Sequence, residues 1–273
     1  MATALNGLLL VGGKSTRMGS DKAHLCYRND MPEWQRLHKL LANVCHNVFL
    51  SHPADQDFGV AAIHDPGLGP LHAIHAAMQS APSADWLVIA CDLPLLESET
   101  LEQLVHDSAT NHDATAFTSR VDGKFEPLCT IYRASASSAI ADAVSEDIRC
   151  PRKVLHTALN TQSLMLNNPH ALDNANSPAD SLEVRAHLQG ARIEKEITVR
   201  YFAQLKEIAA VDTEPWTTAS VTPSGVYEEL KAKYKFPHKQ KQLMVAINDD
   251  FADWATPIKA GDELVFIPPV AGG

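Results

Sequence analysis

The sequence contains no apolar run near the roughly 20 residues that a membrane-spanning helix needs. Its N-terminus also lacks the basic region, apolar stretch and cleavage site of a secretory signal. We therefore expect a cytoplasmic protein that does not act on membranes. Internal repeats are absent as well. At 273 residues and 45% hydrophobic content, the chain is predicted to form one large or two smaller globular domains.

Cysteine is scarce and basic charge is in the minority. The five cysteines are odd in number and lack paired metal-ligand spacing, which is typical of reduced thiols in a cytosolic protein. The formal net charge is −10. This balance argues against a general nucleic-acid binder. It does not exclude a nucleotide ligand, because the local charge of a site decides that.

The first 190 residues alternate between strand-like and helix-like segments, which predicts a doubly wound α/β domain with a mostly parallel sheet. Such domains bind ligands beyond the carboxyl ends of their strands. The predicted strands are 8–11, 48–50, 61–63, 86–90, 114–118, 128–132 and 164–166, and the predicted helices are 34–44, 71–78, 98–106 and 178–188.

A second, smaller domain is predicted over residues 196–273. Gly190 marks a break after the last helix of the first domain, 1–190, and a short linker follows. Thr222 and Pro223 form a good N-cap and first-turn pair for a helix that continues through Tyr234. Strand-like segments flank this helix on both sides. Strands, one helix and more strands fit a β-grasp topology.

Residues 10–22 read LVGGKSTRMGSDK and are the most informative part of the chain. A strand runs into paired glycines, where backbone N–H groups can cradle phosphate oxygens. Arg17 and Lys22 add positive charge. A P-loop would need glycine where Leu8 stands, and the dinucleotide pattern G-x-G-x-x-G is absent. The remaining pattern, G-G-x-S-x-R-M-G-x-D-K, closely resembles the entrance loop of the molybdenum cofactor guanylyltransferases, within the wider nucleotidyltransferase superfamily.

This resemblance implies transfer of GMP from GTP to molybdopterin, with release of pyrophosphate and with Mg²⁺ as cofactor. Phosphoryl-type transfer depends on positioning and on charge neutralisation. The implied catalytic residues are Arg17, Lys22 and Asp92, with Asp92 as the Mg²⁺ ligand in an Asp-x-Pro element after strand 86–90. The implied GTP-binding residues are Leu10, Val11, Gly12, Gly13, Lys22, Ser51, Asp65 and Asp92.

Several of these positions have a second interpretation. Family members usually carry Ala at the position of Val11 and often Asn at that of Ser51. Asp65, in the run DPGLGPL, is a candidate acceptor for the guanine base, but Asp-Pro with Gly is also an ordinary turn. Asn174 and Asn176 resemble an Asn-x-Asn-Thr-Pro element that would bind the pterin or the metal. Asn and Ser before Pro also cap helices.

The segment from about Glu196 to Gly273 resembles the small subunit of molybdopterin synthase, a ubiquitin-like sulfur carrier. The matching runs are TVRYFA at 198–203, VAIN at 245–248 and GDELVFIPPVAGG at 261–273. The resemblance implies that the Gly273 carboxylate is adenylated by a separate activating enzyme and converted to a thiocarboxylate. It also implies the large synthase subunit as the partner that receives the sulfur.

Three alternatives stay open. The first is a cytidylyltransferase for the same cofactor, although such relatives usually carry Ala-Gly in place of Gly12-Gly13. The second is a sugar-nucleotide pyrophosphorylase, which would leave the sulfur-carrier domain unexplained. The third is a sulfur carrier on a catalytically inactive platform. The presence of Arg17, Lys22 and Asp92 argues against this last possibility.

Overall fold

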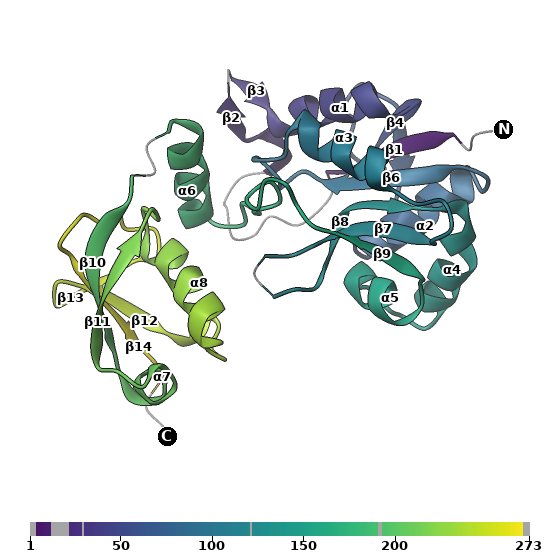
Figure 1. The fold of residues 1–273 in the computed structure, drawn as a ribbon. Helices are drawn as coiled ribbons and strands as arrows, with labels where there is room; N and C mark the ends of the chain where they lie inside the picture. The colour runs from purple at the N-terminus through teal and green to yellow at the C-terminus, as the bar shows by residue number, and fades with distance from the viewer. Residues whose placement is uncertain (1–3, 12–21, 29, 121, 191–192, 270–273) are drawn as a thin grey trace. The chain divides into compact units, whose positions relative to one another are not determined.

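The computed structural model describes residues 4–11, 22–28, 30–120, 122–190 and 193–269 (Figure 1). The chain divides into two compact units, Met1–Asn174 and Ala175–Gly273. In the first unit, the described strands form a seven-stranded sheet in the order β5-β4-β1-β6-β8-β7-β9. Their bounds are β1 Leu5–Leu10, β4 Asn47–His52, β5 Ala62–His64, β6 Asp85–Ala90, β7 Ala114–Thr118, β8 Phe125–Tyr132 and β9 Thr161–Leu164.

This sheet confirms the predicted mostly parallel, doubly wound domain. All of its neighbouring pairs are parallel except those of β8, which runs antiparallel to both β6 and β7. One predicted strand is misplaced: the strand expected at 164–166 is β9, at Thr161–Leu164. Two short strands, β2 (Cys26–Arg28) and β3 (Met31–Pro32), form a separate ribbon after the 3₁₀ helix η1 (Lys22–His24).

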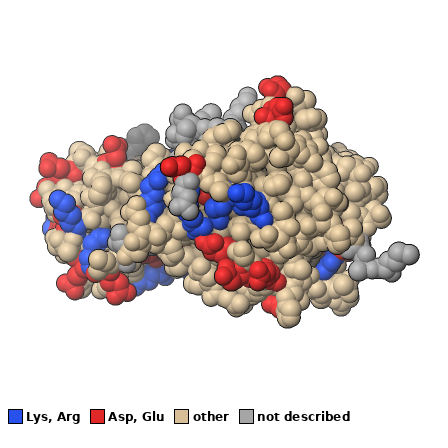
Figure 2. All heavy atoms as spheres, turned by 90° about the horizontal axis from the view of Figure 1, so that it is seen from above, with Lys and Arg blue, Asp and Glu red and all other residues tan. Residues whose placement is uncertain are grey.

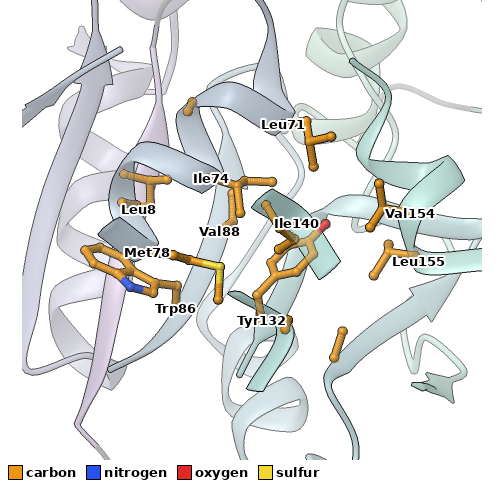
Figure 3. Close-up of a cluster of buried hydrophobic side chains, with 14 of the residues drawn as sticks. Leu8, Leu71, Ile74, Met78, Trp86, Val88, Tyr132, Ile140, Val154 and Leu155 are labelled. Carbon is orange, nitrogen blue, oxygen red and sulfur yellow. The ribbon is translucent and has the colours of Figure 1, made fainter. Parts of the chain in front are cut away.

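Helices cover both faces of the sheet. One face carries α1 (Glu33–Val44) and α3 (Ser98–Asp107), and the other carries α2 (Pro70–Ser80), α4 (Ser137–Ser145) and α5 (Pro151–Thr157) (Figure 1). Alternate strand residues therefore enter two cores. Leu9 and Ile89 belong to the α1–α3 core, whereas Leu8, Trp86 and Val88 belong to the other (Figure 3). Burial of each large side chain contributes roughly 1.5–3 kcal/mol.

The second unit holds a five-stranded sheet in the order β11-β10-β14-β12-β13. The helix α8 (Pro223–Tyr234) packs on it through buried Val226, Tyr227 and Leu230. Thr222 is the N-cap of α8, as predicted, and its side chain accepts a bond from the Gly225 N–H. This is the expected β-grasp arrangement. The other bounds are β10 Lys195–Tyr201, α7 Ala203–Ala209, β11 Thr213–Thr218, η3 Gln240–Gln242, β12 Met244–Ile247, β13 Asp250–Ala252 and β14 Glu263–Ile267.

Helix α6 (Pro178–Leu188) lies in the second unit, whereas the sequence predicted that it closes the first domain. Its Glu183 side chain explains the difference. One carboxylate oxygen accepts bonds from the Val221 N–H at 2.7 Å, the Thr222 N–H at 2.8 Å and the Thr222 hydroxyl at 2.9 Å. A Cβ at Gly225 would lie 2.6 Å from the same oxygen. Glu183 therefore satisfies donors at the start of α8.

Replacing Glu183 with alanine is expected to destabilise the second unit by about 1–3 kcal/mol, because the backbone donors that it satisfies lose their partner. Hydrogen exchange of the Val221 and Thr222 amides should become faster, and unfolding should begin at a lower denaturant concentration. The control is Leu182→Ala on the same helix, whose side chain is 39% exposed and caps no backbone donor, so its loss should cost less than the loss of Glu183 and leave the exchange of both amides unchanged. Unchanged exchange in Glu183→Ala would contradict the capping role.

Figure 2 shows basic and acidic side chains in small groups, separated by larger areas without charged residues. Several acidic groups are paired directly, as in Arg28–Glu97 at 2.6 Å and Arg152–Asp122 at 3.0 Å. Exposed pairs of this kind contribute little to stability, about 0–1 kcal/mol each. These pairs neutralise charge locally, within a chain whose formal net charge is −10.

Candidate active site

Four parallel strands, β5, β4, β1 and β6, end at the same edge of the first sheet. Leu10, the last residue of β1, lies in register with Ser51 on one side and Ala90 on the other. The ladder continues one step further. The Val11 N–H donates to the Ser51 carbonyl and the Cys91 N–H to the Leu10 carbonyl, both at 3.1 Å. Val11 and Cys91, the first residues after β1 and β6, are thus held next to the neighbouring strand.

Asp65 follows β5 at this edge and is bound to β4. The Ser51 hydroxyl donates to Asp65 Oδ2 at 2.6 Å, and the Gly67 N–H donates to Oδ1 at 2.7 Å. Gly67 has a φ of 69° and Gly69 a φ of 115°, values that favour glycine. The turn between Asp65 and α2 therefore needs both glycines, and it fixes the direction of the carboxylate.

The sequence placed Ser51 directly on the nucleotide. In the structure Ser51 is buried, with 1% of its surface exposed, and its hydroxyl is donated to Asp65. The side chain therefore supports Asp65, and its backbone carbonyl anchors Val11. The turn interpretation of Asp65 and the ligand interpretation are compatible, because each carboxylate oxygen can accept two hydrogen bonds.

Asp92 lies two residues beyond the end of β6 and is half-buried. It precedes a turn of buried residues, Leu93, Pro94, Leu95 and Leu96, that leads into α3. Asp92 and Asp65 thus follow strands that end at one edge of the sheet. Within the described ranges, no three His, Cys, Asp or Glu side chains gather into a metal-binding group. A single carboxylate fits Mg²⁺, which often binds through one or two carboxylates together with substrate phosphates and water.

Four predicted site residues, Gly12, Gly13, Arg17 and Gly273, lie outside the described part of the chain. Lys22 begins η1, but its side chain lies outside that part too. The predictions for these five positions stay predictions. Leu10 and Val11 are described and buried, with 7% and 4% exposed. Because their side chains are buried, only their backbone can face a ligand, and within it the Val11 N–H already donates to Ser51 and the Leu10 carbonyl already accepts from Cys91.

The Asn174–Asn176 segment has a described structural role. Asp180 Oδ2 accepts the N–H groups of Asn176 and Ser177 at 2.8 and 2.9 Å, and the Ser177 hydroxyl accepts the Asp180 N–H. These bonds form a capping box at the start of α6. The capping interpretation is thus confirmed for Ser177, while pterin binding by the two asparagines stays a prediction.

Beside Asn174, Asp173 belongs to a polar cluster that the sequence did not indicate. Arg120 donates to its two oxygens at 3.0 and 2.8 Å, and His170 Nδ1 lies 2.8 Å away. Burial alone would raise the pKa of the Asp173 carboxyl, but the bonds from His170 and Arg120 outweigh it and lower the pKa. Asp173 therefore stays ionised at neutral pH and ties the loop before Asn174 to the hairpin between β7 and β8.

In the second unit, the strand that leads to the C-terminal glycines is central. β14 pairs with β10 on one side and β12 on the other, and its Leu264 and Phe266 are fully buried. Around its carboxyl end lie exposed apolar side chains. Met244, which pairs with Ile267, is 55% exposed, and Phe202, next to the partner of Phe266, is 45% exposed. Both side chains are thus open to solvent beside the strand that leads to the C-terminal glycines.

None of the helices in the described part of the chain combines the length and apolar character needed to cross a membrane. The chain matches the sequence model of the MobA-like NTP transferase domain over residues 7–162 and that of the ThiS family over residues 199–273. The fold of the first unit is similar to the crystal structure of molybdopterin-guanine dinucleotide biosynthesis protein A from Archaeoglobus fulgidus. The TM-score is 0.58 at 20% identity, covering 68% of this chain and 99% of that one.

Two curated relatives are similar in sequence. A molybdenum cofactor biosynthesis bifunctional protein of Synechocystis sp. is 37% identical over 185 residues, which cover 65% of this chain and 53% of that protein. This chain thus spans about half the length of that relative. A probable molybdenum cofactor guanylyltransferase of Synechococcus elongatus is 32% identical over 185 residues, covering 63% of this chain and 94% of that protein.

Proposed function

Because the chain belongs to the MobA-like NTP transferase family and carries a ThiS-family domain behind it, we propose that it serves molybdenum cofactor biosynthesis with both units. The first unit transfers GMP from GTP to molybdopterin and releases pyrophosphate. The observation that carries this proposal is the shared strand edge, at which Leu10 lies in register with Ser51 and which Asp65 and Asp92 follow in the chain. The guanylyltransferase name of the Synechococcus relative supports the choice of nucleotide.

In this reaction a terminal phosphate oxygen of molybdopterin attacks the α-phosphorus of GTP, and the bond to pyrophosphate breaks. Asp92 would hold Mg²⁺, which would neutralise charge on the triphosphate. The Leu10 and Val11 backbone would line the base and ribose, and Gly12, Gly13, Arg17 and Lys22 would bind the phosphates. Asn174 and Asn176 are proposed for the pterin substrate. The chain's contribution is mainly to position two anionic reactants.

Asp65 is the proposed acceptor for the guanine base. Guanine presents two adjacent donors, N1–H and the exocyclic amine, and a carboxylate held in one orientation can accept from both. The bonds from Ser51 and Gly67 provide that orientation. Neither cytosine nor adenine offers the same pair of donors. Asp65 therefore supports GTP over CTP as the substrate. A nucleotide-binding experiment tests the cytidylyltransferase alternative directly.

Replacing Asp65 with asparagine is expected to weaken GTP binding by roughly 10- to 100-fold, because bonds to a charged acceptor contribute about 1.5–3 kcal/mol. ITP lacks the exocyclic amine, so the wild-type preference for GTP over ITP should disappear in this variant. Calorimetric titration with the two nucleotides measures both effects. Ser51→Ala, which removes only the supporting hydroxyl, should have a smaller effect. An unchanged GTP preference in Asp65→Asn would exclude a base-reading role.

The first test of the proposal is thermal unfolding with Mg²⁺ and GTP, with Mg²⁺ and CTP, or with Mg²⁺ alone. A ligand at 100 times its dissociation constant stabilises the native state by about 2.7 kcal/mol. Stabilisation by GTP alone supports guanylyl transfer. Stabilisation by CTP alone supports the cytidylyl alternative. No response to either nucleotide would favour a sulfur carrier on an inactive platform.

The second unit is proposed to carry sulfur as a thiocarboxylate on Gly273. A separate activating enzyme would adenylate the carboxylate, and the large subunit of molybdopterin synthase would receive the sulfur. The exposed Phe202 and Met244, together with Phe251 at 74% exposure, provide an apolar surface for such partners around the strand that leads to the tail.

A further inference from the structure

Arg36 of α1 holds the turn that follows Asp92. Its Nη1 donates to the Leu96 carbonyl at 2.7 Å, and its Nη2 donates to the carbonyls of Leu93 at 3.2 Å and Pro94 at 3.4 Å. Leu93 is 4% exposed and Leu96 is fully buried. The Leu93 carbonyl also accepts the Leu96 N–H at 3.1 Å, so losing the guanidinium would remove one of two donors from it and the side-chain donor from the Leu96 carbonyl. One side chain thus fixes the backbone directly after the proposed metal carboxylate.

Glu33 in turn holds Arg36 and links it to the exit of the glycine-rich segment. Arg36 Nε lies 3.0 and 2.8 Å from the two Glu33 oxygens. The Glu33 N–H donates to the carbonyl of Leu25, the residue after η1, at 2.9 Å. Burial raises the pKa of the Glu33 carboxyl, and the charge and hydrogen bonds of Arg36 offset part of this rise. The side chains of Glu33 and Arg36 are 1% and 11% exposed.

A buried ion pair is costly to desolvate and is a poor source of net stability. The pair instead fixes the relative positions of the segments that it joins. A planar guanidinium with five donors can bind a carboxylate and several carbonyls at once, which a lysine ammonium cannot. We propose that Arg36, oriented by Glu33, is a positioning residue that sets where Asp92 stands relative to the chain leaving η1. This inference rests on the proposed role of Asp92 as a metal ligand.

The chain offers a matched control at the opposite end of the same strand. Asp85 begins β6, and Arg133 Nη1 donates to its Oδ2 at 2.7 Å. Arg133 Nη2 also lies 3.4 Å from the carbonyls of Ser108 and Ala109. The side chains of Arg133 and Asp85 are 15% and 8% exposed. This pair therefore has the same chemistry and similar burial, but it stands at the amino end of β6, away from Asp92.

The test compares Arg36→Met with Arg133→Met in the full chain. Both variants should unfold at lower temperature than the wild type. Binding of Mn²⁺ in the presence of GTP, measured by electron paramagnetic resonance, should weaken about 10- to 100-fold in Arg36→Met, the range typical for loss of a group that orients a metal ligand. It should be unchanged in Arg133→Met. Hydrogen exchange of the Leu96 amide should become faster in Arg36→Met alone.

Equal Mn²⁺ binding in the two variants would overturn the inference while leaving the proposed function intact. Absence of GTP-dependent Mn²⁺ binding in the wild type would overturn the proposed function, and this inference with it. If Arg36→Met does not fold, Arg36→Lys and Arg133→Lys replace the pair. Lysine keeps the charge next to Glu33 but cannot bind the three carbonyls together. Weakened binding is then expected only in Arg36→Lys.

Discussion

Replacing Asp92 with asparagine should lower kcat/KM for GMP transfer by about 10³-fold, which corresponds to about 4 kcal/mol of lost transition-state stabilisation. The amide keeps the volume and one acceptor oxygen but loses the charge that would hold Mg²⁺ against the triphosphate. Asp92 lies half-buried after β6, so the fold should tolerate the change. Mg²⁺-dependent thermal stabilisation by GTP should also decrease, and this measures binding independently of turnover.

Asp57→Asn is the matched control for Asp92→Asn. Asp57 lies in the exposed loop after β4, at the same edge of the sheet, and its Oδ1 accepts the Gly59 N–H at 2.8 Å. Both variants remove one negative charge from the same end of the domain. A general electrostatic effect would therefore appear in both. Comparable activity in the two variants would show that Asp92 is not the metal ligand.

The sequence predicted the layers of the first unit well because hydrophobic periodicity records them directly. The fully buried run of β6 is typical of a strand covered on both faces. Trp34, Leu37 and Leu41 occur at helical spacing, and all three are buried in α1. Hydrophobic periodicity does not reveal the direction of β8, since a strand buried on both faces has the same pattern of apolar residues in either direction. The short connection from Thr118 to Phe125 permits a hairpin, and that was the available signal.

The candidate site was predicted where residue type and strand ends coincide, and missed where a side chain acts through a distant segment. Asp65 and Asp92 follow strands whose carboxyl ends share one edge, so their placement follows from topology. From the sequence alone, Arg36 would be predicted to be a solvent-exposed side chain on an amphipathic helix. Its partners Leu93 and Leu96 lie about sixty residues away. The hydroxyl of Ser51 and the carboxylate of Glu183 likewise act on segments that only the folded chain brings near.

Deleting Gly273, or adding an affinity tag behind it, should reduce sulfur transfer to background and leave GMP transfer unchanged. Adenylation and thiocarboxylate formation need a terminal carboxylate that can enter a narrow active site, where a chain of glycines passes without hindrance from Cβ atoms. β14 is anchored between β10 and β12, and Pro268 and Pro269 stiffen the exit from it. The length of tail beyond this anchor therefore sets how far the carboxylate reaches.

Both activities should be measured on one preparation, with intact-protein mass spectrometry for the thiocarboxylate and pyrophosphate release for GMP transfer. An N-terminal tag is the control, and it should leave sulfur transfer intact. Gly273→Ala keeps the carboxylate and the reach but adds a methyl group, so its sulfur transfer should fall between that of the wild type and that of the deletion. Sulfur transfer that survives the deletion would mean that Gly273 is not the carrier. Loss of GMP transfer in the same variant would mean that the two activities are coupled through the chain, since no residue proposed for GTP lies beyond Asp92.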